Sequence, residues 1–184
     1  MLRLLKMGKR EYENLKKIGL CYRYLDQPEK ALPYFRQAEN LDPDDLHTEV
    51  SMGHCLLEME EFDEALKSYF KVEYLDPSNH KVWRPIAWCS FVLEKFDQAR
   101  KYYEKLLEEN PNQFDLMNLG HLEWCEGNRK AAVDRYKESI RRKETSFEQF
   151  MESFEEDKHY LIGYGVDPAE IPIMMDHLRY SLEE

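Results

Sequence analysis

The stretch "IGLCYRYLDQPEKALPYFRQAENLDP", Ile18 to Pro43, decides the fold of this chain because its landmarks return at a fixed spacing. Gly19 is followed 34 residues later by Gly53, and after 34 more by Ala87. The same spacing separates three further sets of residues: Ala31, Ala65 and Ala99; Phe35, Tyr69 and Tyr103; Pro43, Pro77 and Pro111. A fourth copy contains Gly120, Ala132 and Tyr136 and is one residue shorter, because of a deletion between Pro111 and Gly120. A fixed period of this length indicates a protein built from stacked structural repeats.

Each copy predicts two helices joined by a turn. In the first copy, Leu15, Ile18 and Tyr22 lie three to four residues apart and form one apolar stripe on the first helix. The second helix ends at "LDPDD", "LDPSN" or "ENPNQ", because proline cannot continue a helix and Asp or Asn starts the next one. Glycine inside a helix costs about 1 kcal/mol relative to alanine. Its return therefore predicts that the two helices of a copy pack closely at Gly19 and its equivalents.

This spacing resembles that of the tetratricopeptide repeat. The residues that carry the resemblance in the first copy are Leu15, Ile18, Gly19, Tyr22, Ala31, Phe35, Ala38 and Pro43. Trp83 stands at the family's leading tryptophan in the third copy, whereas Glu49, Glu123 and Ser139 depart from the pattern. The resemblance implies an all-α fold, a right-handed α-α superhelix of antiparallel helix pairs. We expect a helical extension at residues 1–11, repeats at 12–45, 46–79, 80–112 and 113–145, and a helical cap at 146–184.

A histidine beside a cysteine, His54–Cys55, is the most obvious candidate for chemistry. Cys21, Cys55 and Cys89 follow the same 34-residue spacing, so they occupy one structural position repeated in neighbouring copies. Helices pack about 8–10 Å apart, which is too far for these cysteines to form a disulfide or to share a metal ion. The chain also lacks a glycine-rich phosphate loop, an "HExxH" motif and a Ser–His–Asp arrangement. We therefore expect no catalytic residue, no cofactor and no metal site, and we predict that the chain is not an enzyme.

The amino-acid composition restricts the classes of partner that we expect for this chain. The 184 residues are 42% apolar and 34% charged, which is typical of a globular protein. A net charge of −11 repels phosphate backbones, so nucleic acid is not an expected partner. No run of about 18 apolar residues is present, so we expect no membrane span. Four cysteines are too few for a disulfide scaffold, and a reducing cytoplasm is the simplest location.

The resemblance implies a function in binding other proteins, because stacked helix pairs form an extended concave surface. In the family, the first helix of each repeat lines that surface and the usual ligand is a peptide or a helix of another protein. The predicted lining residues, from the positions facing that surface, are Leu20, Arg23, His54, Leu57, Arg84, Trp88, Phe91, Phe114, Met117, His121 and Trp124. We predict a non-catalytic scaffold or adaptor whose partner the sequence does not identify. Two alternatives stay open: a secretion-type or general chaperone for a hydrophobic client segment, and a regulatory fragment of a larger multi-domain protein.

Residues 146–184 do not follow the repeat. Ser146 and Gln149 predict a capping box at the start of a helix. Phe147, Phe150 and Phe154 then form an apolar stripe, and a second helix is expected after Asp167. This segment either closes the exposed core of the last repeat or fills the concave surface with its own helix, and the sequence leaves both open.

Overall fold

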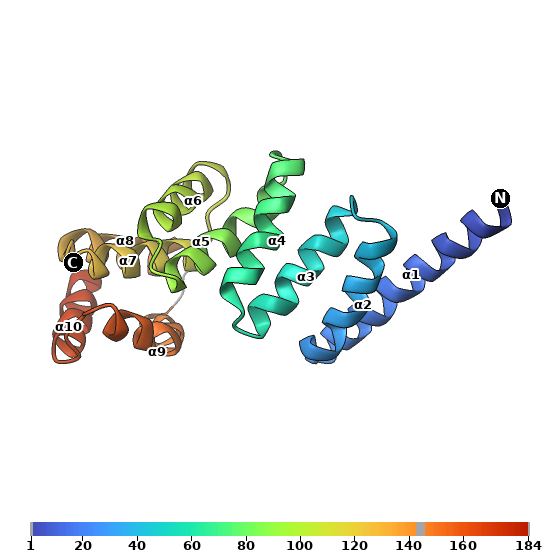
Figure 1. The fold of residues 1–184 in the computed structure, drawn as a ribbon. Coiled ribbons are helices and arrows are strands. Elements are labelled where there is room, and N and C mark those ends of the chain that lie inside the picture. The colour runs from blue at the N-terminus through green and yellow to red at the C-terminus, as the bar shows by residue number, and fades with distance from the viewer. Residues whose placement is uncertain (1, 143–145, 184) are drawn as a thin grey trace. The chain divides into compact units, whose positions relative to one another are not determined.

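Helices joined by short turns make up the computed structural model of the chain, which describes residues 2–142 and 146–183 and the side chains of residues 8–142 and 146–182 (Figure 1). Those ranges contain ten α-helices, one short 3-10 helix and no strand. The helices of the first half are α1 (Leu2–Tyr24), α2 (Pro28–Leu41), α3 (Leu46–Glu58), α4 (Phe62–Leu75), η1 (His80–Val82) and α5 (Trp83–Val92). Those of the second half are α6 (Phe96–Glu109), α7 (Gln113–Cys125), α8 (Arg129–Arg142), α9 (Phe147–Gly163) and α10 (Glu170–Glu183). The predicted all-α architecture of paired helices is confirmed.

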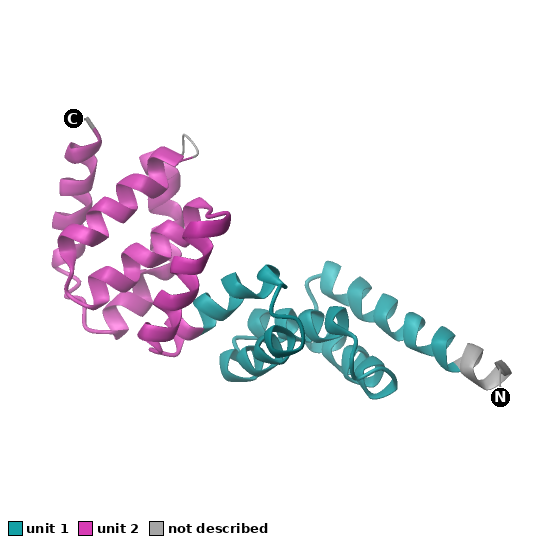
Figure 2. Cartoon of the chain, turned by 90° about the horizontal axis from the view of Figure 1, so that it is seen from above, with its two compact units in different colours: residues 1–89 teal, residues 90–184 magenta. Residues whose placement is uncertain are grey.

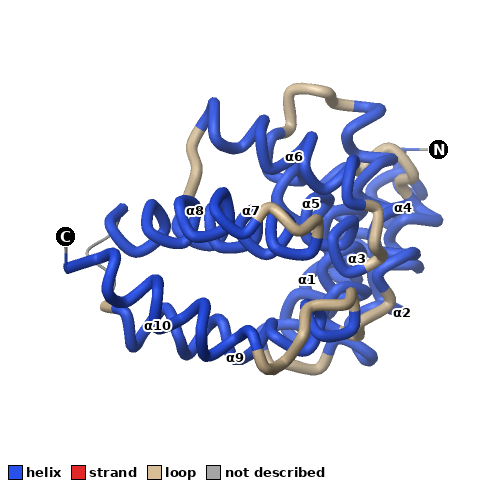
Figure 3. Tube along the Cα trace, turned by 90° about the vertical axis from the view of Figure 1, so that its left-hand side faces the viewer, coloured by secondary structure: helices blue, strands red, loops and turns tan. Residues whose placement is uncertain are grey.

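The chain forms two compact units, residues 1–89 and 90–184 (Figure 2). In unit 1, α1 pairs with α2, α3 pairs with α4, and α2 packs on α3. In unit 2, α7 pairs with α8, α6 packs on α7, and the last two helices follow, with α9 on α7 and α10 on α8 (Figure 3). The predicted end of the fourth repeat, at residue 145, lies outside the described residues, as do Met1 and Glu184.

The glycines of the repeat lie where two helices touch. A methyl group added to the backbone at these positions would lie 2.8 Å from the Phe35 ring at Gly19, 2.7 Å from the Tyr69 ring at Gly53 and 2.4 Å from the Tyr136 ring at Gly120. All three rings are fully buried. The close packing that the repeated glycine predicts is therefore present in all three pairs, and the buried ring lies on the second helix each time.

The turn between the two helices of each copy has the same backbone shape. The residue two before the second helix of each pair has a positive φ: 55° at Asp26, 60° at Glu60, 57° at Glu94 and 84° at Gly127. The amide of the next residue then donates a hydrogen bond five residues back, as from Glu61 to Leu56, at 2.8–3.0 Å in the four copies. This is the Schellman arrangement, which satisfies the carbonyls at a helix end. In three of the four copies the residue with the positive φ is not glycine, although a left-handed conformation costs about 1–2 kcal/mol for other residues.

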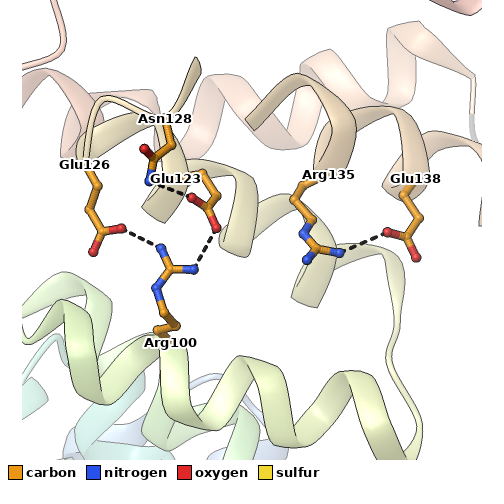
Figure 4. Close-up of polar contacts among 6 residues, drawn as sticks. All are labelled: Arg100, Glu123, Glu126, Asn128, Arg135 and Glu138. Atoms are coloured by element: carbon orange, nitrogen blue, oxygen red, sulfur yellow. Dashed lines mark hydrogen bonds and ion pairs between the residues drawn. The ribbon is translucent and has the colours of Figure 1, made fainter. Parts of the chain in front are cut away.

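An ion pair accounts for the departure from the repeat pattern at Glu123. Arg100 on α6 donates to the Glu123 carboxylate at 2.6 Å and to that of Glu126 at 2.5 Å, and Asn128 donates to Glu123 at 3.0 Å (Figure 4). The equivalent positions at the first junction between copies are Leu32 and Leu56, both buried and lining one cavity. Between the third and fourth copies, therefore, a pair of opposite charges stands at the positions that two buried leucines occupy between the first and second copies.

The other two departures also have polar partners. Glu49 is 4% exposed, and Lys71 of α4 donates to its carboxylate at 2.5 Å and to that of Glu39 at 2.6 Å, so one lysine joins α2, α3 and α4. The Ser139 hydroxyl on α8 donates to the Gln113 carbonyl at 2.7 Å, at the first residue of α7. Buried polar groups that find partners in this way are compatible with a well-packed core.

Candidate functional site

Six of the predicted lining residues belong to unit 1 and lie on the first helix of a copy. They are Leu20 and Arg23 on α1, His54 and Leu57 on α3, and Arg84 and Trp88 on α5. We call this set the first-helix face of unit 1. Arg84 is exposed, and the other five side chains are partly exposed. The face therefore offers cations, apolar side chains and one large ring within reach of solvent.

The polar groups of this face are held by neighbours. Arg23 donates from Nε to the Glu58 carboxylate at 3.3 Å, which joins the last turns of α1 and α3. Burial, together with the Arg23 charge, lowers the pKa of His54 to about 4, so its imidazole is neutral at pH 7. Arg23 therefore contributes the positive charge of this part of the face, while His54 contributes a neutral ring.

Two histidines expected on the lining each share a hydrogen bond with the buried tyrosine of their own copy. The distance from His54 Nδ1 to the Tyr69 hydroxyl is 2.9 Å, and that from His121 Nδ1 to the Tyr136 hydroxyl is also 2.9 Å. Sequence reasoning did not foresee this contact, although the signal was present: in both copies a histidine directly after the repeat glycine precedes a tyrosine by 15 residues. The histidines therefore fix the core as well as border the face.

The thiols show little capacity for chemistry. Cys55 and Cys89 are fully buried, as expected for a repeated core position, whereas Cys21 of the first copy is exposed and does not fit that expectation. Burial raises the pKa of Cys55 to about 11 and that of Cys125 to about 12, so both thiols stay protonated at pH 7 and are poor nucleophiles. His54, the neighbour that could act as a base, is engaged by Tyr69 instead. Among the described residues, no three His, Cys, Asp or Glu side chains are arranged to hold a metal ion.

The remaining five predicted residues belong to unit 2, and there the expectation of an open lining needs correction. Phe91 and His121 are completely buried, and Met117 and Trp124 are each 3% exposed. Phe114 is 44% exposed. Four of the five residues are therefore out of contact with solvent and cannot receive a partner as the structure stands.

Helix α9 is the reason for this burial. Its Phe154 lies 5.4 Å from the His121 ring and 6.2 Å from the Trp124 ring, measured between ring centroids. Nearer its end, Tyr164 lies 5.5 Å from Phe91 and donates a hydrogen bond from its hydroxyl to the Val92 carbonyl at 2.6 Å. A helix tethered in the same chain competes with any external ligand at a high effective concentration.

The tail therefore combines both roles that the sequence left open. Helix α9, which begins with the predicted capping box of Ser146 and Gln149, covers the first-helix residues of unit 2. Helix α10 packs against α8 and so covers the second helix of the last copy. A polar contact also joins α9 to α7, because Nε2 of His121 lies 3.6 Å from the Asp157 carboxylate. Burial lowers the pKa of His121, and Asp157 opposes that shift.

A polar cluster joins α1 to the start of α3. Asp45 caps α3 by accepting from the Thr48 amide at 2.9 Å, and it also accepts from Lys16 at 2.8 Å. Desolvation favours the neutral carboxyl, but the hydrogen bonds from Lys16 and Thr48 outweigh it and hold the pKa of Asp45 well below its usual range. Lys16 is therefore a structural partner of Asp45 on this side of α1.

Comparison with known proteins supports one family. The tetratricopeptide-repeat profile matches residues 12–45, and a second tetratricopeptide-repeat profile matches residues 86–112. No curated protein sequence matches the chain significantly. No described helix has the length and apolar character needed to cross a membrane.

Solved structures with a similar fold share little sequence with this chain. MamA from Desulfovibrio magneticus RS-1 aligns with a TM-score of 0.71 at 14% identity, over 95% of this chain and 98% of that one. MamA of AMB-1 aligns with a TM-score of 0.69 at 16% identity, over 95% and 93%. YrrB, described as a TPR protein with an unusual peptide-binding site, gives 0.62 at 16% identity, over 97% of each chain. At these identities the likeness concerns the fold alone.

Proposed function

Since this chain is a tetratricopeptide-repeat protein, we propose that it is a non-catalytic scaffold that binds a polypeptide on the first-helix face of unit 1. The observation that carries the proposal is the contrast between the two units. In unit 2 the corresponding residues are covered by α9, whereas in unit 1 Leu57 and Trp88 stay partly exposed. Trp88 is a partly exposed aromatic side chain one helical turn from Arg84, and Trp and Arg are the residue types enriched at binding hot spots.

The family relationship supports the same proposal. YrrB is a protein of similar fold and is described as having a peptide-binding site. By analogy, an extended or helical peptide would lie across α1, α3 and α5 and place an apolar side chain against Trp88. The exposed Arg84 and the partly exposed Arg23 would favour acidic residues in that peptide.

A peptide selection tests the proposal. Peptides from a displayed random library would be selected on the immobilised full chain, synthesised, and measured by isothermal titration calorimetry. We expect Trp88→Ala and Arg23→Glu each to weaken the selected peptides about tenfold or more, which is the size of a hot-spot loss. Tyr74→Ala is the matched control, because Tyr74 lies in the same unit on α4 and is 85% exposed.

Circular dichroism would verify that all variants stay folded. The proposal fails if selected peptides bind the Trp88 and Arg23 variants as tightly as the unchanged chain. It also fails if the Tyr74 variant loses binding instead, because the site would then lie on the second helices.

A further inference from the structure

Helix α9 shows how this chain covers first-helix residues with a helix of its own. Four residues of α9, three to four positions apart, share one side of the helix: Phe150, Phe154, Asp157 and Leu161. The two phenylalanines and Leu161 are buried, and the Asp157 side chain is 19% exposed. We call these four residues the α9 stripe. It places an acidic residue between apolar ones.

The acidic residue of the stripe has a partner on α7. Nε2 of the buried His121 lies 3.6 Å from the Asp157 carboxylate, while Nδ1 shares a hydrogen bond with the Tyr136 hydroxyl. The imidazole stays neutral in this arrangement when Tyr136 donates to Nδ1 and Nε2 carries the proton that faces Asp157. Phe154 lies against the same imidazole, at 5.4 Å between ring centroids. The α9 stripe therefore meets His121 with an aromatic ring and with an acid three residues later.

His54 is the equivalent of His121 in unit 1, and its ring is held in the same way. His54 Nδ1 lies 2.9 Å from the Tyr69 hydroxyl, and the two ring centroids are 5.6 Å apart at an interplanar angle of 66°. For His121 and Tyr136 the corresponding values are 2.9 Å, 5.6 Å and 63°. Nε2 of His54 is therefore directed as Nε2 of His121 is. His54 is partly exposed, and in the part of the chain that the structure describes Nε2 has no polar partner.

The neighbours of His54 are compatible with a similar helix. Leu57 has the repeat position of Trp124, against which Phe154 stacks at 6.2 Å, and the smaller leucine leaves room for an aromatic ring. Arg23 is close enough for its charge to lower the pKa of His54. Since Arg23 is already paired with Glu58 at 3.3 Å, the place of an acidic residue in the ligand is set by His54.

We propose that the ligand of the first-helix face of unit 1 is a helix of another protein that carries the pattern of the α9 stripe. Its aromatic ring would pack against His54 and Leu57, and an acidic residue three positions later would accept from Nε2 of His54. This inference rests on the proposed function and adds the chemistry of its ligand. Helix α9 of a second copy is not available for this role, because its Phe154 is fully buried in its own unit.

The test uses fluorescein-labelled peptides of residues 146–164 together with the full chain. A hydrocarbon staple joins positions 148 and 152, which are one helical turn apart and exposed on α9. One peptide is otherwise native, and three carry Phe154→Ala, Asp157→Asn or Glu156→Gln. The last is the matched control for Asp157→Asn, because it also removes one negative charge but at an exposed position.

Fluorescence anisotropy at pH 7 should show saturable binding of the native peptide. Phe154→Ala should weaken binding about tenfold or more, which is the size of a hot-spot loss. Asp157→Asn should weaken it about threefold or more, since a neutral amide accepts a weaker hydrogen bond than a carboxylate does. Glu156→Gln should change it by less than about twofold.

A variant of the chain shows where the peptide binds. Leu57→Glu should weaken the native peptide about tenfold or more, because it places a carboxylate against the apolar part of the stripe. Leu75→Glu is the matched control, since Leu75 lies on α4 of the same unit and is 47% exposed. That variant should change binding by less than about twofold.

A double variant tests the contact at His54. His54→Leu with Tyr69→Phe reproduces the pair Leu20 and Phe35 of the first copy, so we expect the chain to fold. Asp157→Asn should no longer weaken the peptide on this variant, because the partner of the carboxylate is gone. Circular dichroism verifies that all variants stay folded.

Four outcomes overturn the proposal. They are no saturable binding of the native peptide, unchanged binding by Leu57→Glu, an equal effect of Asp157→Asn on the double variant and on the unchanged chain, and self-association in sedimentation velocity that Leu57→Glu abolishes. The last would identify a second copy as the ligand. Library-selected peptides that bind the first-helix face of unit 1 without the stripe pattern would also overturn this inference, while the proposed function would stand.

Discussion

Replacing Gly120 by alanine tests the close helix packing on which the fold rests. The added methyl carbon would lie 2.4 Å from Cε1 and 2.6 Å from Cδ1 of Tyr136, inside van der Waals contact. The ring cannot move away easily, because it is fully buried, bonded to His121, and packed against Phe150 at 5.3 Å and Phe154 at 6.1 Å.

Overpacking of a core costs about 1–3 kcal/mol, and this confined site belongs at the upper end. The better helix propensity of alanine offsets about 1 kcal/mol of this cost. We therefore expect Gly120→Ala to lower the free energy of unfolding by about 2 kcal/mol, equivalent to a decrease in melting temperature of about 4–8 °C for a chain of this size. Gly53→Ala and Gly19→Ala should cost less, in that order, because their closest approaches are 2.7 and 2.8 Å.

Urea denaturation followed by circular dichroism measures these differences. Gly8→Ala is the matched control, because Gly8 is also helical but has nothing within 4 Å of an added methyl group. That substitution should raise stability by up to about 1 kcal/mol. If Gly120→Ala proves as stable as the unchanged chain while Gly8→Ala behaves as expected, the reasoning from steric contact is refuted.

Three further predictions concern the other interfaces. Arg100→Leu should lower the free energy of unfolding by about 2–3 kcal/mol, because it leaves the Glu123 carboxylate 11% exposed without its cation. The double variant with Glu123→Leu should regain most of that loss, since the equivalent positions at the first junction are the buried Leu32 and Leu56, and urea denaturation of the single and double variants decides this. The free energy of unfolding should fall as the pH drops from 7 towards 4, because the pKa of His54 is lowered from about 6.5 in the unfolded chain to about 4 in the fold and the unfolded chain binds more protons in that window. His54→Gln should flatten this dependence in denaturation curves at pH 7 and pH 5, and an unchanged slope would contradict it. Phe154→Ala should cost about 3–5 kcal/mol by removing a fully buried ring of α9, whereas Tyr180→Ala, at a 69% exposed position, should cost less than about 0.5 kcal/mol in the same assay.

The repeat period was sufficient to predict the helix pairs. Glycine, a ring 16 residues later and proline near the end of the second helix each have a local mechanical meaning, so their return at a fixed spacing predicts the same unit each time. The buried rings opposite Gly19, Gly53 and Gly120 confirm this part of the reasoning. The capping box at Ser146 was also predictable, because it depends on residues only three positions apart.

The candidate site was less predictable, because position in the repeat gives the direction of a side chain but not what lies against it. Phe91, His121 and Trp124 have the positions expected of lining residues, and α9 nevertheless buries them. No local pattern states where a tail helix will pack among several apolar faces. Likewise, Glu123 looked like a departure from the repeat until Arg100, on another helix, proved to be its partner.

The sequence by itself determined that helices would form, where they would pair, and which small residues would lie between them, since those properties depend on spacing within about one repeat. Only the tertiary structure decided which faces remain open. The first-helix face of unit 1 is accessible, whereas α9 covers the equivalent residues of unit 2. The physical reason is that burial depends on the neighbour a side chain receives, and apolar surface is non-directional in its choice of partner.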